Sequence, residues 1–115
     1  MNFDSAIAVC RSFPGVTEDT KWGNDLVFSV GEKMFAVTSH GEAAGMSFKV
    51  EDERFLELTD RPGIIPAPYL ARAKWVYVEN AKALGDEEAA QLLRRSYELV
   101  FAKLTKKLQR EIAGS

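Results

Sequence analysis

The sequence predicts an α+β protein in which an antiparallel sheet carries the N- and C-terminal helices on one face. Three observations lead to this class. Apolar residues at helical spacing open the chain, short alternating runs joined by turns follow, and a long amphipathic segment closes it. With 115 residues the chain can bury one core without disulfides, so we predict a single domain over residues 1–115.

The first element is predicted to be a short amphipathic helix. Phe3, Ile7 and Cys10 recur at helical spacing, and Pro14 and Gly15 end the segment. These three side chains should dock on the core. A buried cysteine behaves as a small hydrophobe with a disfavoured thiolate, so Cys10 is not expected to act as a nucleophile.

A β-hairpin with a two-residue Gly31-Glu32 turn is the clearest element, and the charged segment 17–22 before it is predicted as an edge strand. In the simplest register Phe28 faces Phe35. One face would then hold Leu26, Phe28, Val30, Phe35 and Val37, and the other Val27, Ser29, Met34 and Ala36. The second face is smaller and more mixed, as expected when helices cover only one side of the sheet.

The middle of the chain predicts two more strands around a helix and a loop. Residues 46–50 alternate as a strand does, and 51–58 predict a brief helix with an acidic start. Residues 59–73 hold three of the four prolines and are predicted as a structured loop with a turn of helix. The β-branched and aromatic run 74–80 predicts the last strand.

One long C-terminal helix is predicted, with Asp86 as its cap and Ile112 near its end. Its apolar stripe contains Ala89, Leu93, Tyr97, Val100, Leu104 and Leu108. It should contribute more to the core than any other element.

Composition indicates a cytoplasmic protein. The N-terminus has neither a basic region nor an uninterrupted apolar run, no segment has the length of a membrane span, and a single cysteine fits a reducing compartment. The net charge is −2, but residues 17–60 hold ten acidic and four basic residues, whereas residues 61–115 hold ten basic and six acidic ones. This polarity is compatible with an anionic partner at the basic end, although a solvated helix surface is the favoured explanation.

No constellation for catalysis stands out, and we predict a non-enzyme with no catalytic residue, cofactor or metal. His40 lies alone in a turn, and Cys10 lies on a different element. A carboxylate pair among Asp25, Glu51 and Glu79 stays open, because these residues could meet at strand ends.

The uncovered sheet face is the remaining candidate surface. Alternation places Met34, Ser47, Lys49, Trp75 and Tyr77 together there. Aromatic rings beside cations can stack on nucleotide bases, but they can also be buried by a second copy of the chain. Self-association or a structural role is favoured, since this face has no obvious basic excess.

Four segments in this order resemble the MmcQ/YjbR-like family of small bacterial proteins. They are FPGVTEDTKWGNDLVFSVGEKMFAV, FKVEDERFLEL, PGIIPAPYLARAKWVYVE and LLRRSYELVFAKL. The match covers nearly the whole chain, from roughly Ala6 to Leu104. The resemblance implies a frataxin-like (CyaY-like) two-layer fold, with helices on one side of an antiparallel sheet. It also implies DNA binding through a "double wing" of hairpins, and it supplies no catalytic residues.

We therefore predict a small binding domain, a monomer or weak homodimer, that binds DNA weakly and in a salt-dependent manner through the hairpin wing and the basic C-terminal half. The expected contacts are Lys33, Lys49, Arg72, Lys74, Trp75, Arg94 and Arg95. Glu32 at the hairpin tip and Glu42 in the next turn weaken this prediction, since a wing on DNA should carry Arg or Lys.

The alternative is a domain that binds a small anion or a protein partner between the Pro-rich loop and the outer sheet face. Its basis is the apolar stretch Ile64, Ile65, Pro66, Pro68 and Tyr69, which is large for a simple connector. Ile64 and Ile65 could instead plug the open end of the sandwich, and their hydrophobicity favours the plug.

Overall fold

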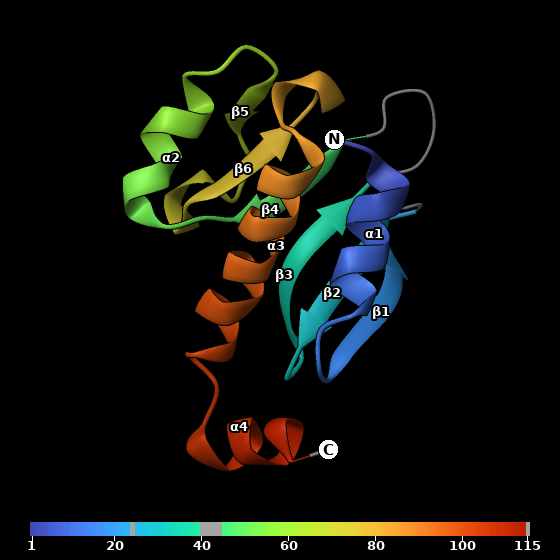
Figure 1. Cartoon of the computed structure of the whole chain (residues 1–115). Coiled ribbons are helices and arrows are strands. Elements are labelled where there is room, and N and C mark those ends of the chain that lie inside the picture. Colours follow the sequence, from blue (N-terminus) through green and yellow to red (C-terminus); the bar gives the residue numbers. More distant parts are fainter. Residues whose placement is uncertain (24, 40–44, 115) are drawn as a thin grey trace.

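A computed structural model describes residues 1–23, 25–39 and 45–114 of the chain (Figure 1). The strands are β1 (Val16–Lys21), β2 (Asp25–Val30), β3 (Lys33–Thr38), β4 (Met46–Lys49), β5 (Ile64–Pro66) and β6 (Trp75–Val78). They form one sheet in the order β1-β2-β3-β4-β6-β5, and each neighbouring pair is antiparallel. The predicted His40 turn and Glu42 lie outside the described residues.

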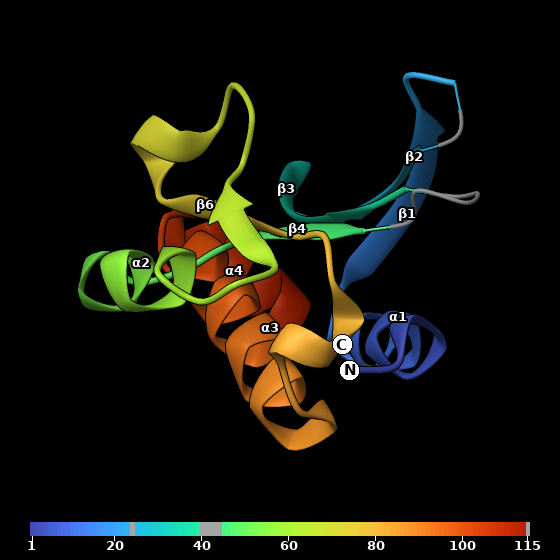
Figure 2. The ribbon, with the colours of Figure 1, turned by 90° about the horizontal axis from the view of Figure 1, so that it is seen from above.

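The helices are α1 (Phe3–Arg11), α2 (Asp52–Thr59), α3 (Asp86–Phe101) and α4 (Lys106–Ala113), with short 3-10 turns η1 (Ala71–Ala73) and η2 (Ala81–Ala83). Seen from above, α1 and α3 lie on the same side of the sheet (Figure 2). Helix α3 packs on β3 and β4, and α2 packs on β5 and β6. The predicted fold class, an antiparallel sheet with the terminal helices on one face, is confirmed.

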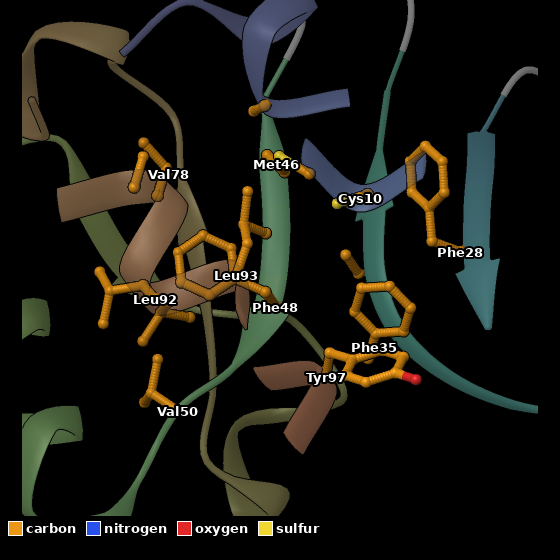
Figure 3. Packing of buried hydrophobic residues seen from close by; sticks show 14 of the residues in the cluster. Cys10, Phe28, Phe35, Met46, Phe48, Val50, Val78, Leu92, Leu93 and Tyr97 are labelled. Carbon is orange, nitrogen blue, oxygen red and sulfur yellow. The ribbon is translucent and has the colours of Figure 1, made fainter. Parts of the chain in front are cut away.

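The core lies between the sheet and these helices (Figure 3). The ring of Tyr97 meets that of Phe35 edge-on, with 5.5 Å between the ring centroids. Cys10 is fully buried from α1, as predicted, and burial raises the pKa of its thiol to about 12. The thiol therefore stays protonated at neutral pH and serves as packing.

A β-bulge in β3 changes the predicted register of the hairpin. Val30 pairs with Lys33 across the turn as expected, but Phe28 pairs with Ala36, because Phe35 is an extra residue without a partner in this ladder. The predicted pairing of Phe28 with Phe35 is wrong. One inserted residue moves every later side chain to the other face, so Ala36 joins the core and Val37 points to the outer face.

The predicted single C-terminal helix is also wrong, because α3 ends at Phe101 and α4 begins at Lys106. The Thr105 side chain caps α4 by accepting a 3.2 Å hydrogen bond from an amide of its first turn. The side-chain amide of Gln109 donates to carbonyls at the end of α3, including that of Phe101 at 3.0 Å. At the other end of α3 the cap is Gly85, not Asp86.

The break lets α4 turn back under the hairpin. Leu104 and Leu108 lie against the hairpin tip so closely that a Cβ on Gly31 would come within 2.7–2.9 Å of them. Ile112 approaches Gly15 in the same way. Tertiary burial of these apolar residues outweighs helix propensity at the corner.

The Pro-rich segment forms a sixth strand that the sequence did not predict. β5 pairs with β6 at the edge of the sheet, where Pro66 is tolerated. Ile64 is buried in the core, whereas the side chain of Ile65 is 37% exposed. Only Ile64 therefore acts as the predicted plug. The predicted turn of helix in this segment is η1.

Candidate ligand groove on the outer sheet face

A groove of about 450 Å³ lies on the sheet face opposite α1 and α3. Figure 2 shows the end of β1 and the loop after β5, which carry the residues of its two rims, on that side of the sheet. Its lining residues are Trp22, Asp25, Met34, Val37, Ser47, Pro68, Tyr69 and Leu70. The volume falls within the range of small-molecule sites, and the lining is mostly apolar, as such sites are. We call this feature the outer groove.

Tyr69 forms one rim from a tight turn. The amide of Leu70 donates a 3.1 Å hydrogen bond to the carbonyl of Ala67, which closes a four-residue turn with Pro68 and Tyr69 at its centre. Tyr69 has a φ of 67° at the third position, where type II turns favour glycine. Its side chain is fully exposed, at 104% of the reference area, so core packing does not explain a tyrosine here.

Trp22 forms the other rim with the same backbone anomaly. It follows β1, has a φ of 49° and is 67% exposed. Positive φ is uncommon for bulky side chains and costs free energy that the rest of the fold must supply. Two exposed aromatic residues in left-handed conformations therefore line one groove, and strained positions of this kind cluster at binding sites.

The floor of the groove comes from the centre of the sheet. Met34 and Ser47 reach it by strand alternation, as predicted for the outer face. Val37 reaches it because of the β3 bulge, and it pairs with Val27 of β2 and Ser47 of β4. The bulge therefore supplies part of the apolar floor.

Asp25 is the one charged side chain among the eight residues described along this groove. It begins β2, and its backbone pairs with that of Lys21 on β1. Among the described residues, its carboxylate takes part in neither a salt bridge nor a hydrogen bond. The carboxylate therefore lies beside an apolar surface without an ion-pair partner among the described residues.

Trp75 does not join this surface, which corrects the predicted aromatic platform. Its side chain is only 4% exposed. The loop before β6 is bonded to the same residue, since the Trp75 amide donates to the carbonyl of Leu70 at 3.2 Å and the Trp75 carbonyl accepts from the Ala67 amide at 3.0 Å. Tyr77 is partly buried and packs against Gly45. Trp75 is therefore unavailable for stacking in this conformation.

Most of the basic residues predicted to bind DNA make contacts within the protein. The Lys49 ammonium donates to the carbonyl of Ala73, and burial followed by the nearby charge of Lys103 lowers its pKa. The Lys74 ammonium lies 5.1 Å from the centroid of the Phe55 ring. The two lysines therefore make contacts that stabilise β4, η1 and α2, which leaves them less free to bind phosphate.

The remaining predicted cations are dispersed. Arg95 pairs with Glu51 at 3.0 Å and with Glu98 at 3.4 Å, and Arg94 lies 3.9 Å from Glu98. Arg72 is exposed on η1, and Lys33 is exposed at the hairpin tip. The predicted set of seven residues thus does not form one surface.

A different basic cluster lies where the hairpin tip meets the C-terminal corner. It consists of Lys33, Lys103, Lys106, Lys107 and Arg110, which are all exposed. No salt bridge within the described part of the chain involves them. Four of these residues form the pattern K-x-x-K-K-x-x-R from residue 103 of the sequence. The break between α3 and α4 brings this basic segment to the hairpin tip. We call it the basic corner.

The candidate carboxylates do not converge. Glu51 pairs with Arg95, Asp25 lines the outer groove, and Glu79 is exposed just after β6. Across residues 1–23, 25–39 and 45–114, no three His, Cys, Asp or Glu side chains are placed to hold a metal ion together. In the same ranges, no helix combines the length and apolar character needed to cross a bilayer.

The architecture defines a class of small two-layer α+β proteins with a six-stranded antiparallel sheet and helices on one face. The chain belongs to the YjbR family, whose sequence model matches residues 11–99. The family suggested by the sequence is therefore confirmed.

Solved structures agree with this assignment. The crystal structure of Deinococcus radiodurans protein DR2400, with a DUF419 domain, is 31% identical, with a TM-score of 0.84 over 97% of this chain and 88% of that chain. A Pseudomonas syringae protein shares the fold at 23% identity, with a TM-score of 0.72 over 87% of this chain and 99% of that chain. No curated protein matches the chain significantly.

Proposed function

We propose that this YjbR-family protein is a non-enzymatic, cytoplasmic binding domain, a monomer or weak homodimer, that takes a small ligand in the outer groove. The observation that carries the proposal is that Trp22 and Tyr69, both exposed and both at positive φ, line the same groove. An exposed ring gains little from folding, so its backbone cost needs another reason. A bound ligand that buries both rings supplies one.

The groove is better suited to an apolar ligand than to an anion. Asp25 would repel an anion at close range, and no cationic side chain is among the described lining residues. The proposal therefore keeps the Pro-rich loop and outer face as the site and leaves out a small anion as ligand.

A fragment titration followed by amide NMR shifts tests the site. We expect fragments with an aromatic or branched apolar body to shift the amides of Met34, Val37 and Ser47. Trp22→Ala and Tyr69→Ala should weaken binding at least fivefold. Leu56→Ala is the matched control, because Leu56 is an exposed apolar residue on α2 and does not line the groove. Shifts confined to other surfaces, or binding unchanged in both groove variants, would overturn the proposal.

A second candidate function is weak nucleic-acid binding at the basic corner. The close contact of Leu104 and Leu108 with Gly31 supports it, because this contact places Lys33 at the same end of the molecule as the basic residues of α4. Phosphate contacts release counterions, so affinity should fall steeply with salt. Of the contacts expected from the sequence, this candidate keeps Lys33 on the hairpin wing. The other contacts are replaced by the basic residues of the C-terminal corner.

Fluorescence anisotropy with short single- and double-stranded DNA tests this candidate. At physiological salt we expect a Kd of roughly 10⁻⁴ to 10⁻⁶ M, the range of non-specific binding, and tighter binding at low salt. The triple variant Lys106→Gln, Lys107→Gln, Arg110→Gln should weaken it at least tenfold, whereas Lys82→Gln, an exposed lysine on η2, should not. Binding no tighter than about millimolar at low salt would rule the candidate out.

A further inference from the structure

We propose that the ligand of the outer groove is a small organic cation, an alkylated ammonium group attached to an apolar body. This inference rests on the proposed function, since it names the ligand class for the same groove. The feature that selects a cation is the juxtaposition of the Asp25 carboxylate with the exposed rings of Trp22 and Tyr69.

The charge argument starts from Asp25. Its carboxylate lines an otherwise apolar groove, and no described residue neutralises it through an ion pair. A negative charge beside low-dielectric walls attracts cations more strongly than one in open solvent. Lys21 lies opposite Asp25 in the β1–β2 ladder, but it is not among the lining residues. The groove itself thus carries a single negative charge.

The aromatic argument adds the chemical type of the cation. The faces of Trp and Tyr attract cations through the ring quadrupole, and tryptophan is the strongest of the aromatic side chains in this respect. Quaternary and methylated ammonium groups are the ligands most often recognised in this way. Trp22 and Tyr69 come from opposite rims, one from the β1–β2 turn and one from the turn after β5. Both side chains line the groove, so a cation bound there has an aromatic ring at either rim.

The apolar floor of the groove disfavours strongly hydrated cations. Met34 and Val37 offer no oxygen to replace the water around a metal ion or a primary ammonium group. An alkylated ammonium has few or no N–H groups to satisfy, and its methyl groups can pack on this floor. Ser47 leaves one hydroxyl in the groove for a polar substituent of the ligand.

Choline and its uncharged isostere 3,3-dimethylbutan-1-ol form a matched pair of probes. NMR titration of the full chain should show choline shifting the amides around Val37 and Ser47, with at least tenfold tighter binding than the isostere. Asp25→Asn should weaken choline at least fivefold and leave the isostere unchanged. Trp22→Ala and Tyr69→Ala should each weaken choline at least fivefold, while Leu56→Ala and Lys21→Gln should not weaken it.

The outcomes separate the two proposals. Equal binding of choline and the isostere, or Asp25→Asn binding choline as tightly as the wild type, would overturn the cation inference and leave the groove as a ligand site. The same holds if choline does not bind while other fragments do. If neither choline nor any fragment binds the groove, both proposals fail. Melting temperatures of all variants confirm folding, and Tyr69→Ala keeps the test valid because its side chain is fully exposed.

Discussion

The hydroxyl of Ser96 donates a 2.7 Å hydrogen bond to the carbonyl of Phe35 and accepts a 3.1 Å hydrogen bond from the amide of Lys49. Ser96 lies fully buried on α3, and Phe35 is the residue that the bulge leaves without a partner in the β2–β3 ladder. A helix side chain thus satisfies a carbonyl at the bulge. Because the bulge also turns Val37 outward, the core contact and the outer groove depend on each other.

Replacing this serine should destabilise the protein. Ser96→Ala leaves a buried carbonyl and a partly buried amide without their partner, which costs about 1–3 kcal/mol of the free energy of unfolding. Urea denaturation measures the change. Ser5→Ala on α1 is the control, because Ser5 is exposed and we expect a change of less than about 0.5 kcal/mol. If the two variants are equally stable, Ser96 does not support the bulge.

The backbone strain at Tyr69 predicts a variant that gains stability. Glycine removes a left-handed conformational cost of roughly 1–2 kcal/mol, against about 0.5–1 kcal/mol of extra entropy in the unfolded chain. Tyr69→Gly should therefore be as stable as the wild type or up to about 1 kcal/mol more stable, whereas its ligand binding is lost.

Tyr69→Ala separates strain from ring contacts. It keeps the φ of 67° and removes the ring, so its thermal stability should stay within about 0.5 kcal/mol of the wild type. A loss of more than about 1 kcal/mol in the glycine variant would show that the tyrosine ring stabilises the native fold, contrary to its exposure.

The packing of the hairpin tip on the C-terminal corner can be tested at Gly31. This residue has a φ of 57°, and a methyl group there would lie 2.7 Å from a Leu104 carbon. Gly31→Ala should cost about 2–4 kcal/mol, combining backbone strain with overpacking. Differential scanning calorimetry measures the shift.

Gly23→Ala is a matched control for this experiment. Gly23 also has positive φ, at 90°, but apart from its chain neighbours no atom of the described residues lies within 4 Å of the added Cβ. It should therefore show the backbone cost alone, about 1–2 kcal/mol. Equal losses in the two variants would mean that Leu104 and Leu108 do not rest on the hairpin tip.

Acid should weaken an ion-pair network that joins α2 to α3. Arg61 pairs with Glu88 at 2.7 Å and with Glu57 at 2.7 Å, and hydrogen bonds from Arg61 are the main cause that lowers the pKa of both carboxyls below their ordinary 4.5. The unfolded chain then binds more protons as pH falls, so this stabilisation is present above about pH 4.5 and is lost through the lower folded pKa.

Glu88→Gln should lower stability at pH 7 by on the order of 1 kcal/mol or less, since the pair is partly exposed, and should flatten the loss between pH 5 and 3. Glu87→Gln is the control, because Glu87 lies in the same first turn of α3 but makes no ion pair among the described residues. Chemical denaturation across this pH range compares the two. Parallel pH curves for wild type and Glu88→Gln would contradict the network's role.

The fold class and most elements could be predicted from the amino-acid sequence, because each depends on local patterns. Alternation fixed the strands and placed Met34 and Ser47 on the outer face, and the Gly31-Glu32 turn followed from its φ preferences. The helical spacing of Phe3, Ile7 and Cys10 predicted that Cys10 is buried, and the structure confirms it. These patterns require only neighbours a few residues apart.

Three features could not be predicted from local patterns: the bulge at Phe35, the break between α3 and α4, and the burial of Trp75. Each depends on a partner far along the chain. The Ser96 hydroxyl donates to the carbonyl of Phe35, and the α3–α4 corner packs against the hairpin tip. The Pro-rich loop hydrogen-bonds to the backbone of Trp75. Sequence analysis also did not predict that Trp22 and Tyr69 form the rims of the outer groove. Local preference argues against bulky residues at positive φ, and only the folded chain holds Trp22 and Tyr69 there.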